Sequence, residues 1–446
     1  MTYPWRRGVL CKCLGLMILF LLACPAAAEE ELLPPPGKPL NLEQCLAIAL
    51  KYHPALQASL SSIEALKAKV EQSLAAYYPQ VNFNAAYNAN TFNFIAVPGV
   101  AVRPPTYNWT FLDIFSMGPA LTQTIYDFGR TRSNVRVNRE NTRASEQDLV
   151  TNKQTVVLNV KQAYFGLIQA QRIVKVAEDT VKQVQDHLDQ AKGFYQAGTR
   201  PKIDVTKAEV DLANAELALI QARNGLQVAR VTLNNAMGLR ESLSFPIEDT
   251  LDLKKLEITL QEILQAAYEQ RPELLQIKAR QLSQEATIKL AKASYYPILS
   301  GNATYLFRRV HIDLDMVWDA MIGATLTVPI FSGFSSPNQV AEARANLRNL
   351  KAQEETTRQN IRLESEQAFL SLKEAEERVR VTEKALVQAK ENFDLATGRY
   401  QVGVGSPLEV TDAEVSLANA RVNNITALAA YKIAEARIEK AMGLVR

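Results

Sequence analysis

Apolar residues recur at heptad spacing along two very long stretches of the chain. Between Val160 and Ala191 they fall three or four residues apart throughout, which is typical of a helix packed against other helices. No proline interrupts residues 130–195 or 338–400, and a helix of that length spans about 100 Å at roughly 1.5 Å per residue. A further helix after each stretch alternates Ala with Leu or Val. We therefore expect long helices in close antiparallel packing.

Two shorter regions alternate with a period of two. Residues 81–90 carry Val, Phe, Ala and Tyr on one face and mostly Asn on the other, residues 299–305 repeat the pattern, and residues 318–328 alternate apolar side chains with Asp, Gly and Thr. This alternation predicts strands with one apolar and one polar face. We place β-hairpins at about residues 80–126 and 298–330. Pro119 makes the returning strand of the first hairpin the least regular of the four.

The chain is internally duplicated. Pro54 aligns with Pro272, Tyr-Tyr-Pro at residues 77–79 recurs at 295–297, and Ala-Met-Gly-Leu at 236–239 recurs at 441–444. Each half reads as helix, two strands, long helix, turn and helix, so the predicted fold class is mainly α with a small β part. We expect repeat 1 at residues 41–239, a linker at 240–258 and repeat 2 at 259–446. Pro54 and Pro272 predict a kink or break in each first helix.

The N-terminus reads as a secretory signal peptide over residues 1–28. Three basic residues precede the apolar run Leu14–Ala23, and Ala occupies positions 26–28. A competing interpretation is a lipobox at residues 21–24, which would make Cys24 a lipidated N-terminus. Both interpretations stay open. A Pro-rich segment follows over residues 29–40.

Composition and charge exclude several classes of function. The formal net charge is +3, and loss of the three basic residues of the predicted signal peptide leaves a net charge of zero. A nucleic-acid binder usually needs a clustered basic face, so we expect no nucleic acid partner. Cys45 is the only cysteine left after residue 28, and its place in an apolar helical pattern predicts a buried side chain.

No constellation of catalytic or metal-binding residues stands out. Asp127-Phe-Gly129 resembles one kinase motif, but the other kinase motifs do not accompany it. His53, His187 and His311 lie on different predicted elements, with His187 expected on a solvated helix face and His311 in an external loop. We predict no enzyme activity, no cofactor and no metal site.

The aromatic residues bracket the predicted strands. Tyr78 and Tyr296 lie at one end, and Trp109 and Trp318 at the other, as in the aromatic belts of membrane interfaces. With a signal peptide, this favours an outer-membrane barrel whose apolar face meets lipid. Four strands cannot close a barrel, and an open edge in lipid leaves backbone groups unpaired. Several chains must then share one barrel, and the pattern allows two, three or four.

Several short motifs carry a resemblance to a known family. Their order, spacing and duplication over residues 40–444 resemble the TolC-like outer membrane factor family. The motifs are Tyr126-Asp-Phe-Gly-Arg-Thr-Arg-Ser-Asn134, Tyr195-Gln-Ala-Gly198, Tyr400-Gln-Val-Gly403, Val205-Thr-Lys-Ala-Glu209 and Val410-Thr-Asp-Ala-Glu414.

The resemblance implies a homotrimer with a twelve-stranded barrel in the outer membrane of a Gram-negative bacterium, joined to a long periplasmic α-helical barrel. It implies an exit duct of a tripartite efflux pump or type I secretion system. Its partners would be outer-membrane lipid, a periplasmic adaptor (membrane fusion) protein and an inner-membrane transporter.

The resemblance also assigns roles at the two helix turns. Rings of acidic residues close the periplasmic tip in the family, and the matching positions are Glu409 and Asp412, with Asp204 in repeat 1 and Tyr400 in the closed-state network. Gly405 and Ile203 depart from the family pattern, so Arg200 of the other turn is the expected substitute. The adaptor-docking tips would be Gly198, Thr199, Gly403, Val404 and Gly405.

The alternative hypothesis is a secreted or periplasmic coiled-coil scaffold without channel activity. It explains the heptads and the signal peptide. It does not explain the Asn-rich hairpins with aromatic ends, and membrane fractionation would distinguish the two.

Overall fold

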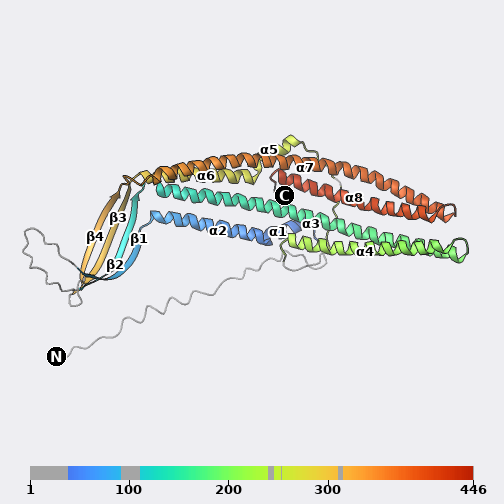
Figure 1. Cartoon of the computed structure of the whole chain (residues 1–446), viewed down its shortest axis with the longest axis horizontal. Coiled ribbons are helices and arrows are strands. Elements are labelled where there is room, and N and C mark those ends of the chain that lie inside the picture. The colour runs from blue at the N-terminus through green and yellow to red at the C-terminus, as the bar shows by residue number, and fades with distance from the viewer. Residues whose placement is uncertain (1–38, 92–110, 240–245, 253, 310–314, 445–446) are drawn as a thin grey trace, which may run out of the picture.

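The computed structural model describes residues 39–91, 111–239, 246–252, 254–309 and 315–444. Within them the chain is mainly helical, with a four-stranded sheet at one end of an elongated helical body (Figure 1). The predicted signal peptide, Cys24, Trp109 and His311 lie outside the described residues.

The elements follow the same order twice. The first set is α1 (Leu42–Tyr52), α2 (Pro54–Leu74), the 3₁₀ turn η1 (Ala75–Tyr77), β1 (Gln80–Thr91), β2 (Phe111–Tyr126), α3 (Arg130–Gln196) and α4 (Lys202–Ala236). The second set is α5 (Leu260–Gln270), α6 (Pro272–Lys292), η2 (Ala293–Tyr295), β3 (Ile298–Arg309), β4 (Val317–Thr327), α7 (Ser335–Gln401) and α8 (Pro407–Ala441). Helices α3 and α7 have 67 residues each, or about 100 Å.

The prolines predicted to interrupt the first helices begin new ones. Pro54 and Pro272 occupy the first positions of α2 and α6, where the missing N–H costs no helical hydrogen bond. His53 Nδ1 accepts a hydrogen bond from Ala55 N at 3.2 Å. A Cβ on Gly238 would lie 2.7 Å from His53 Cα. The glycine of the Ala-Met-Gly-Leu motif therefore lets the end of α4 pack against this break.

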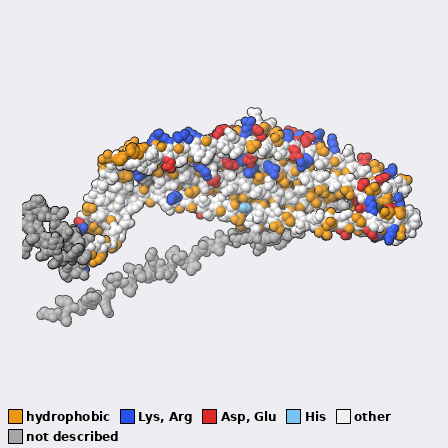
Figure 2. Space-filling view, in the orientation of Figure 1, with side chains coloured by type: hydrophobic (Ala, Val, Ile, Leu, Met, Phe, Trp, Pro, Cys, Tyr) orange, Lys and Arg blue, Asp and Glu red, His pale blue; other side chains and the backbone are white. Residues whose placement is uncertain are grey.

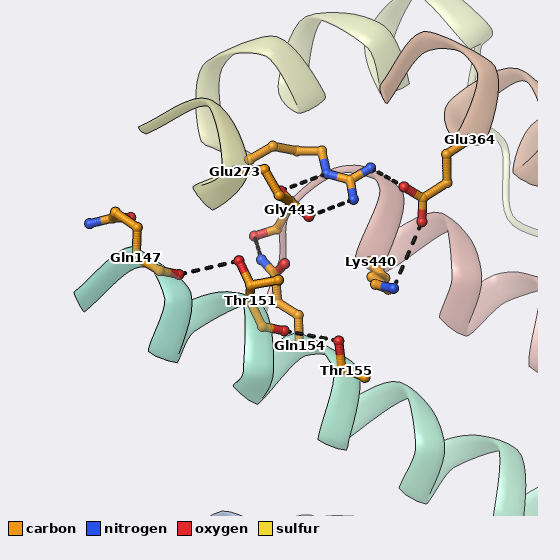
Figure 3. A network of polar contacts seen from close by, with 9 residues as sticks. Gln147, Thr151, Gln154, Thr155, Glu273, Glu364, Lys440 and Gly443 are labelled. Carbon is orange, nitrogen blue, oxygen red and sulfur yellow. Dashed lines mark hydrogen bonds and ion pairs between the residues drawn. The ribbon is translucent and has the colours of Figure 1, made fainter. Parts of the chain in front are cut away.

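A polar joint in the middle of the molecule ties the two sets of helices together. Arg271 is 2% exposed and donates hydrogen bonds to Glu273 at 2.9 Å and to Glu364 at 2.6 Å. In Figure 3, Lys440 approaches the same Glu364 at 3.8 Å, and Gln154 of α3 donates to the Gly443 carbonyl at 2.7 Å. A buried charge is tolerated only when it is paired in this way.

The sheet is antiparallel in the order β1-β2-β3-β4. Its register brings apolar side chains of all four strands to one face and mostly Asn, Ser and Thr to the other. The apolar face holds Val81, Phe83, Ala85, Tyr87, Phe115, Met117, Pro119, Leu121, Leu299, Ala303, Tyr305, Phe307, Trp318, Ala320, Ile322 and Leu326. The predicted two-faced strands thus form one two-faced sheet.

Strand β2 continues through Pro119, which pairs with Phe83. On its other side, Met117 and Ala120 pair with β3, whereas Gly118 and Pro119 between them do not. At Gly118 the Tyr305 carbonyl approaches so closely that a Cβ would overlap its oxygen. The predicted irregularity is therefore confined to the β2–β3 contact.

The long helices form a row with two free edges. Helix α4 packs on α3, α3 on α8 and α8 on α7, so α4 and α7 end the row. Apolar side chains at helical spacing are exposed on both end helices, and Figure 2 shows hydrophobic side chains scattered along this body. They are Ile203, Val210, Leu217, Ile220, Val228 and Val231 on α4, and Leu363, Leu370, Val381, Val387 and Leu395 on α7. In the described part of the chain, none of the helices is long and apolar enough to cross a membrane.

Candidate functional site at the helix tips

The two turns that join the long helices lie together at the end of the molecule opposite the sheet (Figure 1). Each turn follows a glycine in the left-handed region, Gly198 at φ +72° and Gly403 at φ +82°, which glycine adopts without a Cβ penalty. Thr199 donates its N–H to Phe194 O at 3.0 Å, and Val404 donates to Arg399 O at 3.1 Å. Both glycines therefore directly follow the C-cap residues of α3 and α7 and end these helices.

Arg200 links the two turns. Its Nη2 donates to the Gly405 carbonyl at 3.1 Å, and its guanidinium lies 5.5 Å from the centre of the Tyr400 ring. A Cβ on Gly405 would lie 2.8 Å from Tyr400 N. Gly405, which the family comparison marked as a departure, thus lets the second turn close tightly and present its carbonyl to Arg200.

Tyr400 is almost fully enclosed near the tip, at 1% exposed. Its ring contacts Phe194 at 5.7 Å and His187 at 5.0 Å, both from α3. Burial raises the pKa of the Tyr400 hydroxyl, opposed by Arg200 and reinforced by Asp204. Tyr400 therefore packs the α7–α8 hairpin against the α3–α4 hairpin.

The predicted acidic residues differ in their surroundings. Asp204 is half-buried in the first turn of α4, whereas Glu409 and Asp412 are exposed on α8. Glu409 pairs with Arg399 Nε at 3.4 Å. Glu409 and Asp412 lie three residues apart and so share one side of the helix. They form an exposed acidic edge on α8, whereas Asp204 is half-buried on α4.

The aromatic residues predicted at the membrane interfaces lie at opposite ends of the sheet. Tyr78 and Tyr296 are exposed just before β1 and β3, and Tyr296 stacks on Phe128 at 5.2 Å. Trp318 is exposed near the start of β4 and stacks on Tyr305 at 5.8 Å.

A sequence model of the outer membrane efflux protein family matches residues 46–239 and 263–444. Those two segments contain both helix tips and both hairpins. The chain belongs to this family. Like the family, it is an outer membrane protein.

Two relatives of known name are similar in sequence to part of this chain. The outer membrane efflux protein BepC of Brucella suis biovar 1 is 28% identical over 195 residues, covering 42% of this chain and 41% of BepC. The outer membrane protein TolC of Escherichia coli is 24% identical over 197 residues, covering 43% of this chain and 39% of TolC. The chain thus spans about two fifths of the length of these curated relatives.

The fold of the efflux-family chain is seen in solved structures. The CmeC outer membrane channel of Campylobacter jejuni superposes with a TM-score of 0.77 at 20% identity, covering 90% of this chain and 85% of CmeC. At this identity the likeness shows the fold.

Sequence reasoning missed a buried polar cluster in this family member. His187 was expected on a solvated face, but it is only 8% exposed, so that prediction is wrong. Glu414, which appeared only as the last letter of a motif, is 6% exposed. His187 lies on α3 and Glu414 on α8, and the heptad pattern of each helix predicts that its polar side chains face solvent. The pattern does not show that the other helical hairpin packs over these two positions. By contrast, Cys45 is buried as predicted, and burial raises the pKa of its thiol to about 12.

Proposed function

We propose that the chain is the outer-membrane exit duct of a tripartite efflux pump or type I secretion system. It would act as a passive homotrimeric channel, bound to a periplasmic adaptor and through it to an inner-membrane transporter. The observation that carries this proposal is the sheet, which combines a continuous apolar face with two open edges.

The sheet edges support a shared barrel. Strands β1 and β4 each pair on one side only within the described residues. In lipid, unpaired backbone groups cost several kcal/mol each, so such edges must be joined. Three copies would join β1 of one chain to β4 of the next and close twelve strands around a polar lumen.

The helices support the same assembly. The row α4-α3-α8-α7 ends in two helices that expose apolar stripes. Contact between α4 of one copy and α7 of the next would bury both stripes and close the row into a helical barrel. One symmetry thus satisfies the sheet and the helices together.

The tip would be the gate and the docking surface. Three-fold symmetry would repeat the acidic edge of Glu409 and Asp412 around a narrow mouth, where low-dielectric walls focus the field. Asp204, Tyr400 and Arg200 would hold the closed state. The exposed turns around Thr199 and Val404 would meet the adaptor.

The test is single-channel conductance of detergent-extracted, trimer-sized protein in planar bilayers. Glu409→Ala with Asp412→Ala should weaken block by multivalent cations about tenfold or more, because the focused negative charge is removed. Glu391→Ala with Asp394→Ala is the matched control, since these exposed acids have the same spacing on α7. Equal block in wild type and the tip variant would sink the acidic gate, and no conductance from any folded variant would count against the duct.

A further inference from the structure

A cavity of about 170 Å³ lies between the two helical hairpins near the tip, with buried walls on one side and the exposed Asp186 at its mouth. Helix α3 contributes Asp186 and His187, α7 contributes Thr397 and Tyr400, and α8 contributes Glu414. The cavity is separate from the exposed edge of Glu409 and Asp412. Because both hairpins supply its walls, a movement of one hairpin against the other would expose the buried side chains of His187, Tyr400 and Glu414 to water.

Three oxygen atoms at this cavity have no hydrogen-bond partner within the described residues. They are Glu414 Oε1, Thr397 Oγ1 and the Tyr400 hydroxyl, and each is inaccessible to solvent. An unpaired carboxylate is costly to bury, whereas a protonated carboxyl both loses its charge and gains a donor. A cavity of this size has room for a few waters at about 30 Å³ each, which could bridge the three oxygens.

The charged groups around Glu414 offer it no counter-charge. Asp211 of α4 accepts a hydrogen bond from Thr411 at 3.2 Å and adds a second negative charge. Arg200 donates a hydrogen bond to Gly405 O, and its guanidinium lies over the Tyr400 ring. No ion pair to Glu414 occurs in the described part of the chain. The titratable and charged groups facing this region are Asp186 and His187 on α3, Asp204, Lys207 and Asp211 on α4, Arg200 in the turn, Tyr400 on α7 and Glu414 on α8.

The protonation equilibria agree with this geometry. Burial, together with the negative charge of the neighbouring Asp211, raises the pKa of Glu414 to about 7. Burial lowers the pKa of His187, with Asp211 and Asp204 opposing and Lys207 assisting. At neutral pH His187 is therefore an uncharged neighbour rather than a cationic partner for Glu414.

The geometry points to a proton-binding site between the hairpins, in which protonated Glu414 holds α8 against α3 and α7 and its ionisation loosens the tip. In an opened tip Glu414 would meet water and regain its ordinary pKa, so the closed tip binds the proton more tightly. Closure is therefore favoured at low pH, and it weakens as pH rises from the ordinary value of 4.5 to about 7. Over that window the closed-to-open ratio should fall on the order of a hundredfold.

The proton itself can be observed without channel activity. Infrared difference spectra of the detergent-extracted full-length protein between pH 6 and pH 8 should show the carbonyl stretch of a protonated carboxylic acid that disappears as pH rises. Glu414→Gln should lack this band, and Glu391→Gln, at an exposed glutamate on α7, should keep it. A missing wild-type band, or a band that survives in Glu414→Gln, would overturn the site.

The consequence for the tip builds on the proposed function and is measured separately. Open probability in planar bilayers should rise with pH between 5 and 8 in wild type and in Glu391→Gln, and stay at its low-pH value in Glu414→Gln, where the amide cannot ionise. If Glu414→Gln shows the same pH response as wild type, Glu414 does not control closure of the tip, even though the channel conducts. Absence of conductance in all three, with the infrared band present, would contradict the duct and leave the proton site standing.

Discussion

At the scale of single residues, the tip depends on how closely two turns can approach. Gly405 accepts the Arg200 hydrogen bond through its carbonyl, while its missing Cβ leaves room for the backbone at Tyr400. The sequence marks Gly405 only as a departure from a family pattern. The structure supplies a steric reason for glycine at position 405 and shows that Arg200 donates a hydrogen bond to its carbonyl oxygen.

Gly405→Ala should destabilise the tip by about 1–3 kcal/mol, because the new Cβ forces the turn away from Tyr400 and Arg200. The control is Gly398→Ala on α7, where a Cβ would have nothing within 4 Å. Its helical backbone should gain about 0.5–1 kcal/mol. Hydrogen exchange of tip amides measures both effects. Equal protection in Gly405→Ala and wild type would contradict the steric argument.

At the scale of elements, α3 and α7 each run unbroken from the sheet to the tip, whereas the strands need local adjustments. β2 passes through Pro119 and then shifts register between Thr124 and Tyr126. Proline removes a ladder donor, and the β2–β3 pairing skips Gly118 and Pro119. The heptad and period-two patterns predict these elements well, because each reflects local backbone geometry.

Gly118→Ala should lower the yield of folded protein in the outer membrane several-fold, because its Cβ would overlap the Tyr305 carbonyl and part β2 from β3. Gly323→Ala on β4 is the control, since its Cβ would meet only the Asn302 side chain at 3.4 Å. Protease resistance of membrane-extracted protein reports the folded fraction. If the two variants fold equally well, the close approach of β2 to β3 at Gly118 does not determine the yield of folded protein.

At the scale of the whole molecule, the chain is unfinished on its own. Among the described residues, β1 and β4 each lack a pairing partner on one side, and the helical row ends in α4 and α7 with exposed apolar stripes. A water-soluble scaffold would expose this apolar sheet face to solvent, at a cost proportional to its area. A lipid-facing barrel removes that cost.

Ile322→Arg should therefore impair membrane insertion by about 2–4 kcal/mol if its side chain, which is 90% exposed on the apolar face, points into lipid. Thr325→Arg, on the polar face of the same strand, should insert normally. Fractionation with high salt and then detergent measures the outcome. Release of the wild-type protein by salt alone would instead support a scaffold.

The sequence by itself determined the duplicated order of elements, the lengths of α3 and α7, the two-faced strands and the prolines at the breaks in the first helices. These features follow from periodicity and from the backbone preferences of Pro and Gly, which act over a few residues. The family resemblance carried the gate and docking residues, and their roles stay predictions.

Only the tertiary structure decided which faces meet. It brought Arg200 to Gly405, enclosed His187 and Glu414 between hairpins about two hundred residues apart in sequence, and aligned the apolar faces of four strands. No local pattern predicts these pairings. Heptad spacing shows that one face of a helix is buried, and it does not show which helix packs against that face. Glu414 is buried without a counter-charge because the two helical hairpins pack around it.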